Sequence, residues 1–212
     1  MDQQRNAASL GMWLFLGTEI MFFGGMFCAY LIYRNWYYNE FAAASRTLDL
    51  PIGTANTAVL ICSSLTVALS IRAAQMGRRM LTVWLLLATL FFGLVFLGVK
   101  GYEWEQKFKE HHVPGYSFNV DDIMHDYPQL PIDPQHTELF FTLYFAMTGM
   151  HALHMIIGVG IFTYLAFSAW KGRYGPEYYT PLEMGGLYWH FVDIVWIYLF
   201  PLLYLIDRKP LH

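Results

Sequence analysis

The sequence predicts an all-α fold: a polytopic membrane helical bundle with five transmembrane helices, formed as a single membrane domain by residues 1–212. Hydrophobic residues make up 56% of the chain and charged residues only 14%, and a soluble core of that composition would lack the polar surface to cover it. The apolar residues are also gathered into runs of about 20 or more, the length that crosses a bilayer as a helix. The five runs are 7–33, 51–71, 80–99, 139–170 and 184–206.

The first run, at 7–33, is too long for the core of a signal peptide, so we interpret it as a membrane-spanning helix. It is followed by Arg34 and the aromatic residues 36–38, a combination that is typical of a helix end at the membrane surface. Inside the run, Gly24 and Gly25 offer a small-residue face at which a neighbouring helix could approach closely.

The second and third runs, 51–71 and 80–99, are joined by a short connection. Arg72, Arg78 and Arg79 crowd this connection, and such a density of basic residues favours the cytoplasmic side of a membrane. Because five spans place the two ends of the chain on opposite sides, we predict a cytoplasmic N-terminus and a periplasmic C-terminus.

The third and fourth runs are separated by one long connection, at residues 100–138. Its prolines and aspartates predict an extended extramembrane loop, with a short amphipathic helix at 103–109. In the predicted topology this loop lies on the periplasmic side.

Two acids lie inside the apolar runs, where a carboxylate costs several kcal/mol unless it is protonated, paired or facing water. The first is Glu19, which shares a helix face with apolar side chains and has no cation within one turn. Two interpretations stay open: a neutral acid that fastens two helices together, or an acid that handles protons or contacts lipid.

The second acid, Asp193, lies three residues after His190, so the two side chains share one helix face. They could form a proton relay, but a self-sufficient polar pair that pins the last helix is the favoured interpretation. His151 and His154 repeat that spacing in the fourth run. We favour helix packing or hydrogen bonding for them, because a metal site needs three or four ligands. No metal site and no catalytic residue is predicted.

Three segments resemble subunit III of the haem–copper cytochrome c oxidases, in the short five-span bacterial form. They are 12–24 (MWLFLGTEIMFFG), 148–158 (TGMHALHMIIG) and 188–196 (YWHFVDIVW). Glu103-Trp104 is similar to the family's Glu-aromatic pair, although Lys100 stands where longer members usually carry glutamine. By this resemblance Glu19 corresponds to the family's membrane-embedded glutamate. The two histidines of the second segment, with His190 and Asp193, correspond to its characteristic polar residues, and Glu103 is a structural or lipid-contact candidate.

The resemblance implies a non-catalytic subunit of a proton-translocating oxidase, which stabilises the catalytic subunit and supports proton uptake during oxygen reduction in aerobic electron transport. It implies that haem and copper are bound by partner subunits and not by this chain, with phospholipid as a candidate ligand. The implied partners are oxidase subunits I and II, and further candidates are subunit IV, a donor cytochrome c and a larger respiratory supercomplex. The implied location is the bacterial cytoplasmic (inner) membrane, in contact with membrane lipids.

Three alternatives remain: an accessory protein of a bacterial nitric oxide reductase, subunit III of a quinol oxidase, and an independent proton-coupled transporter. The transporter is disfavoured because the sequence shows no internal repeat. A nucleic-acid-binding role is excluded by the net charge of −3 and by the scatter of basic residues through short connections.

Overall fold

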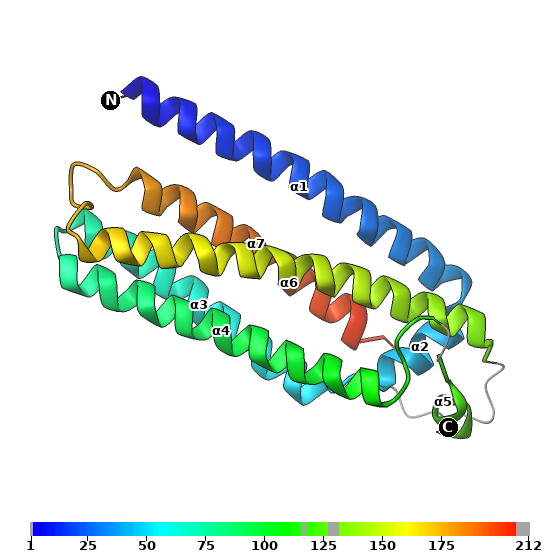
Figure 1. Cartoon of the computed structure of the whole chain (residues 1–212). Coiled ribbons are helices and arrows are strands. Elements are labelled where there is room, and N and C mark those ends of the chain that lie inside the picture. Colours follow the sequence, from blue (N-terminus) through cyan, green and yellow to red (C-terminus); the bar gives the residue numbers. More distant parts are fainter. Residues whose placement is uncertain (1, 116–117, 127–131, 207–212) are drawn as a thin grey trace.

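The computed structural model describes residues 2–115, 118–126 and 132–206, and this part of the chain is almost entirely helical (Figure 1). Its helices, in chain order, are α1 (Asp2–Trp36), α2 (Tyr38–Arg46), α3 (Leu50–Gln75), α4 (Arg79–Lys109), α5 (Asp121–Asp126), α6 (Pro134–Trp170) and α7 (Thr180–Tyr204). Five of them, α1, α3, α4, α6 and α7, are long and apolar enough to cross a membrane. The predicted all-α fold with five spans is confirmed.

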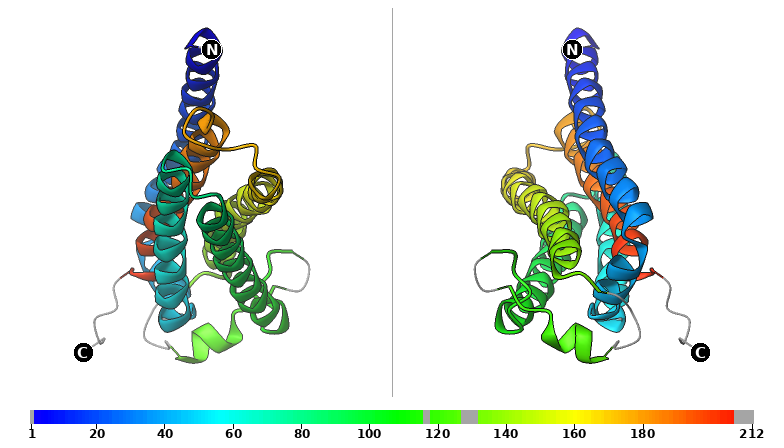
Figure 2. Two further views of the ribbon diagram at one scale, coloured as in Figure 1. Left: turned by 90° about the vertical axis from the view of Figure 1, so that its left-hand side faces the viewer. Right: turned by 90° about the vertical axis from the view of Figure 1, so that its right-hand side faces the viewer.

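Four of the long helices form a closed bundle, in which α3 packs on α4, α4 on α6, α6 on α7 and α7 on α3. The turn between α3 and α4 places Gly77 at φ +70°, a left-handed conformation that glycine adopts without strain. The fifth long helix, α1, lies along the outside against α7 and α6, and its N-terminal end projects beyond the bundle (Figures 1 and 2).

Close helix packing is concentrated around Trp189 of α7, whose side chain is fully buried. A Cβ atom on Gly93 of α4 would lie 2.8 Å from this indole, and one on Gly158 of α6 would lie 3.0 Å from it. Glycines on two neighbouring helices therefore open the slot that the indole fills. The described helices of this chain make no close approach at Gly24 and Gly25, since none of their atoms would come within 4 Å of a Cβ there.

The start of the long connection, predicted at residue 100, is wrong: α4 continues to Lys109. The short helix expected at 103–109 is the last part of α4 and not a separate element. The helix continues past its apolar run because Lys100, Glu103 and Lys107 share one face at helical spacing and are buried against polar partners. The first charged residue after the apolar run, Lys100, therefore does not mark the end of α4.

The end of the connection also differs from the prediction, because α6 begins at Pro134. Asp133 caps the helix by accepting a hydrogen bond from the backbone N–H of Gln135, at 2.9 Å. The connection is thereby shortened to 110–133, with α5 inside it. Residues 116–117 and 127–131 of the predicted loop lie outside the described part of the chain, as does the C-terminal segment 207–212.

Helix α2 was not predicted, since it is short and its alanine-rich sequence has no long apolar run. It packs beneath the ends of α6 and α7, with Phe41 and Ala44 fully buried. Ser45 of α2 donates a hydrogen bond to the carbonyl of Leu203 at 2.7 Å, and Lys107 of α4 donates one to the carbonyl of Thr47 at 2.9 Å. The segment expected only as a surface anchor therefore joins one end of the bundle together.

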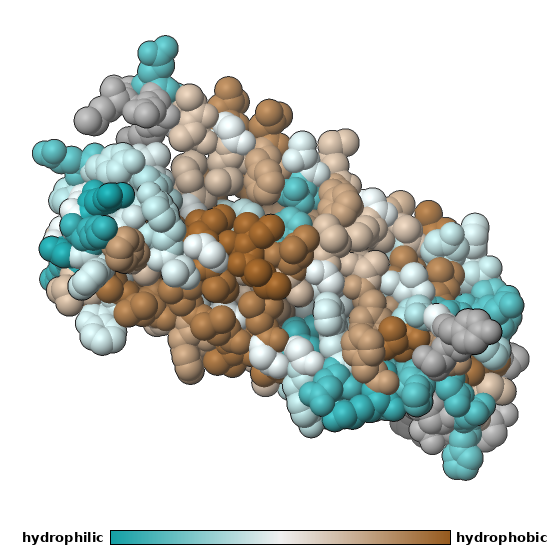
Figure 3. Space-filling view, in the orientation of Figure 1, coloured by the Kyte–Doolittle hydropathy of each residue, from teal (hydrophilic) through white to brown (hydrophobic). Residues whose placement is uncertain are grey.

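The surface seen in Figure 3 carries its hydrophobic side chains across the middle of the molecule and more of its hydrophilic ones toward the two ends. Large apolar side chains such as Leu14, Trp84 and Ile156 are more than half exposed along the spans. This distribution fits a multi-pass membrane protein whose apolar middle faces lipid.

Candidate functional site

Among the described residues, three groups inside the spans contain the acids that the sequence singled out, and the first surrounds Glu103 near the end of α4. Lys100 donates its three ammonium protons to Glu103 Oε2 (3.1 Å), Tyr144 Oη (3.2 Å) and Tyr204 Oη (3.0 Å). Both tyrosine hydroxyls donate in turn to Glu103 Oε1, with 2.7 Å for Tyr144. Every proton of the ammonium has an acceptor, so the buried ion pair is fully satisfied and joins α4, α6 and α7.

The sequence marked Glu103 as a structural or lipid-contact candidate, and the structure places it in the interior. Its side chain is 2% exposed, so its contacts are with protein groups. Sequence reasoning missed Tyr144 and Tyr204, and it noted Lys100 only as a departure from the family pattern. The available signal was the i,i+3 spacing of lysine and glutamate, whereas the tyrosines come from two other helices.

The second group is the pair of Glu19 on α1 and His154 on α6. His154 Nδ1 lies 2.8 Å from the carbonyl oxygen of Met150, which only accepts, so Nδ1 carries a proton. The opposite nitrogen, Nε2, lies 3.1 Å from Glu19 Oε2. A hydrogen bond there needs one proton, which belongs either to a neutral carboxyl group or to an imidazolium ring.

The surroundings of this pair fix the imidazole in place. The Phe23 ring stands edge-on to the His154 ring, with centroids 5.3 Å apart, and the Tyr188 hydroxyl donates to the His154 carbonyl at 2.9 Å. Glu19 itself is half-buried, at the outer side of the bundle. The pair therefore joins α1 to α6. The sequence showed no cation near Glu19 because its partner comes from 135 residues later.

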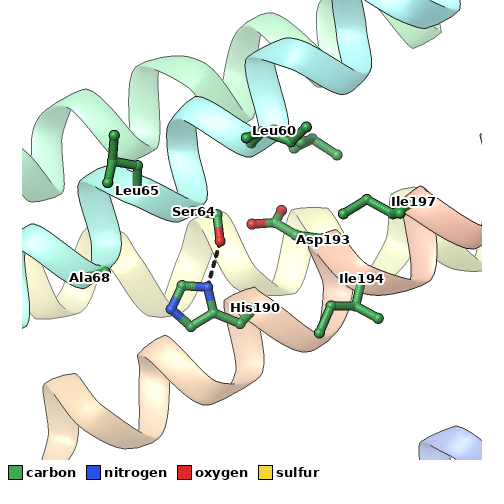
Figure 4. Close-up of a pocket in the computed structure, with 9 residues that line it drawn as sticks. Leu60, Ser64, Leu65, Ala68, His190, Asp193, Ile194 and Ile197 are labelled. Atoms are coloured by element: carbon green, nitrogen blue, oxygen red, sulfur yellow. Dashed lines mark hydrogen bonds between the residues drawn. The ribbon is translucent and has the colours of Figure 1, made fainter.

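The third group contains His190 and Asp193 on α7 and Ser64 on α3 (Figure 4). The expected pair between His190 and Asp193 is not formed, because both side chains reach across to α3. His190 Nδ1 lies 2.6 Å from Ser64 Oγ. The Asp193 carboxyl group approaches the Ser64 hydroxyl, but neither carboxyl oxygen reaches hydrogen-bond geometry. Asp193 is only 3% exposed.

His151 stands apart from the three groups and is buried between helices. Its ring lies between Phe96 and Trp196, at centroid distances of 5.4 and 5.2 Å. Among the described residues neither of its ring nitrogens has a hydrogen-bond partner. Within the described residues no group of three or more His, Cys, Asp or Glu side chains could hold a metal ion.

Taken together, the fold and these groups define a polytopic helical membrane protein that keeps several ionisable side chains inside its spans. Residues 135–207 match the family model described as cytochrome c oxidase subunit III. Cytochrome c oxidase subunit 3 of Thermostichus vulcanus is 30% identical over 94% of this chain and 87% of its own length. This chain therefore belongs to the cytochrome c oxidase subunit III family, as the sequence motifs indicated.

Two further relatives extend the comparison to other oxidases. The probable quinol oxidase subunit 3 of Staphylococcus haemolyticus is 28% identical over 93% of this chain and 88% of its own length. The haem–copper oxidase subunit I+III of Aeropyrum pernix is 29% identical over 92% of this chain, which corresponds to 22% of that longer protein. The relatives thus include proteins named as cytochrome c oxidase and quinol oxidase subunits, and one whose name joins subunits I and III.

Proposed function

We propose that this chain is the non-catalytic subunit III of a respiratory haem–copper terminal oxidase, and that it stabilises the catalytic subunit and supports proton uptake during oxygen reduction. The observation that carries this proposal is the match to an oxidase subunit 3 along 94% of the chain. The Glu19–His154 pair supplies a group through which such a subunit would act on protons.

We assign haem and copper to partner subunits, because the described histidines inside the spans lie in different places and do not meet at one point. His151 is enclosed by aromatic rings, His154 is bonded at both nitrogens, and His190 is bonded to Ser64 through Nδ1. A redox centre would need several such side chains to converge on one point. In this proposal the partner subunits carry out the chemistry of oxygen reduction.

The proton role follows from the two arrangements open to the Glu19–His154 hydrogen bond. When the carboxyl group gives up its proton, the imidazole can accept it, because Nδ1 remains bonded to Met150 in both states. Glu19 lies at the middle of α1 and is half-buried, so it can exchange that proton with a group outside the bundle. The pair would act as a local proton reserve beside a proton-consuming subunit.

The partners and the orientation are part of the same proposal. The name of the Aeropyrum pernix relative joins subunit I and subunit III in one chain, which supports subunit I as a direct neighbour, and subunit II would complete the core. The basic turn with Arg72, Arg78 and Arg79 would face the cytoplasm, which places the N-terminus inside and the 110–133 connection in the periplasm. A cytochrome c is the proposed electron donor, and the Staphylococcus haemolyticus relative makes quinol the second candidate.

The proposal is tested by purifying the tagged chain in mild detergent and measuring its reduced-minus-oxidised haem spectrum and its oxygen consumption. We expect haem and cyanide-sensitive oxygen uptake to accompany the chain, with reduced cytochrome c or a quinol as the donor that sustains it. Haem with nitric oxide reduction and no oxygen uptake would instead identify an accessory protein of a nitric oxide reductase. A haem-free chain that moves protons alone in liposomes would be a transporter, which would refute the proposal.

A further inference from the structure

The outer face formed by α3 and α7 carries polar groups at the depth where a membrane tolerates them least. Ser64 and Asp193 lie within about 2 Å of the midpoints of their helices, at a rise of 1.5 Å per residue. At that depth neither water nor lipid headgroups are available as hydrogen-bond partners. A charged phospholipid headgroup is thereby excluded as the natural partner of these side chains.

These polar groups have hydrogen-bonding capacity that the described part of the chain does not use. Among the described residues His190 bonds only through Nδ1, and neither carboxyl oxygen of Asp193 has a partner in hydrogen-bond geometry. Exposed threonine hydroxyls in the spans bond within their own helix: Thr18 donates to the carbonyl of Phe15 and Thr163 to that of Val159. Leaving a polar group unpaired in hydrocarbon costs several kcal/mol. A binding partner that supplies a hydrogen-bonding group to this face would remove that cost.

The shape of the face indicates which kind of binding partner fits it. A cavity of about 380 Å³ opens between the two helices, and all of its lining residues come from α3 and α7 (Figure 4). Its rim is apolar, and on α3 the exposed side chains of Ile61, Leu65 and Leu69 continue as a row at every fourth residue. Such a row is the ridge that packs into the groove of another helix. A compact ligand would fill the cavity but leave most of this row bare.

We propose that the α3/α7 face docks a transmembrane helix of another oxidase subunit. This α3/α7 face consists of Ile61, Ser64, Leu65, Leu69, His190, Asp193, Ile194 and Ile197. The docked helix inserts a hydrogen-bonding side chain, such as arginine, asparagine, tyrosine or tryptophan, into the cavity at mid-membrane depth. That side chain meets His190 Nε2, with the Asp193 carboxyl group behind it as a further acceptor. The inference rests on the proposed function, because it requires a partner subunit, and it adds which surface that partner covers.

The first test is site-specific photocrosslinking in the intact complex, with a benzophenone amino acid in place of Ile197. The matched control has it in place of Ile157 on the outer side of α6, since the two side chains are 45% and 47% exposed. We expect the first position to crosslink to a transmembrane segment of another subunit of the haem-containing complex, at least tenfold more than the second. The crosslinked segment should carry a hydrogen-bonding side chain within one helical turn. Equal crosslinking from both positions, or adducts with lipid or quinone only, would overturn the inference.

The second test blocks the cavity by Ala68→Trp, a substitution on its exposed rim, with Ile157→Trp as control. We expect at least a tenfold loss of haem per purified chain for the first variant and none for the second, at equal amounts of folded chain in the membrane. If wild-type chain carries no haem, the proposed function itself fails. If wild type carries haem and Ala68→Trp retains it, the function stands and the docking surface is wrong.

Discussion

Removing the charge of Glu103 tests whether the buried cluster around it holds α4, α6 and α7 together. In Glu103→Gln the ammonium of Lys100 stays buried and loses its charged partner. Breaking a buried ion pair by removing one partner costs roughly 3–5 kcal/mol. In a chain of this size each kcal/mol corresponds to about 2–4 °C of Tm. We therefore expect Tm to fall by roughly 6–20 °C, a range obtained by combining these two magnitudes.

The measurement is the fraction of detergent-solubilised chain that stays monodisperse after stepwise heating. The matched control is Glu105→Gln, which removes the partner of Lys109 on the same helix. That pair, at 2.7 Å, is exposed to solvent, so we expect its loss to leave Tm unchanged. The double variant Lys100→Met with Glu103→Leu should recover most of the stability, since it leaves no buried charge. Equal Tm values for Glu103→Gln and Glu105→Gln would refute the structural role of the cluster.

Three further variants probe other parts of the bundle. Gly93→Ala should destabilise the chain by about 1–3 kcal/mol, because its Cβ would meet the Trp189 indole. The control Gly98→Ala has open space around its Cβ and should not destabilise the chain, so equal unfolding temperatures would contradict the packing. His151→Leu should raise stability by about 1–3 kcal/mol, since neither buried imidazole nitrogen has a hydrogen-bond partner among the described residues; a loss of stability would show that one of them has a partner. Asp193→Asn should lower the yield of haem-containing complex without changing the pH dependence of turnover, and the reverse outcome would make Asp193 a proton-handling group.

The fold class was predictable because apolar run length is a local property of the chain. Helix ends were less predictable, since they depend on neighbours. Lys100 and Glu103 are charged, yet α4 continues through them because Tyr144 and Tyr204 of other helices satisfy them. For the same reason α2 was missed: it is stable through Ser45, Phe41 and the helices that it supports, and not through its own sequence pattern.

The candidate site was predicted as a set of residues but not as a set of pairs. Spacing along one helix indicated that His190 would bond to Asp193 and gave no partner for Glu19. The structure pairs His190 with Ser64 and Glu19 with His154, in both cases across helices. Sequence spacing reports only which side chains share a face, whereas the partner depends on which helix packs against that face. Helix order around the bundle was not available from one sequence.

The rate of oxygen reduction by the intact oxidase carrying Glu19→Gln, measured from neutral to alkaline pH, tests the central claim most directly. Glutamine keeps a hydrogen bond to His154 but has no proton to transfer. Thr18→Val is the matched control, because Thr18 is the neighbouring residue and its hydroxyl donates to the Phe15 carbonyl within α1. We predict that Glu19→Gln matches wild type at neutral pH and slows increasingly as protons become scarce, while Thr18→Val follows wild type throughout. Identical pH profiles for Glu19→Gln and wild type would contradict the proton role and leave the pair as a fastener between α1 and α6.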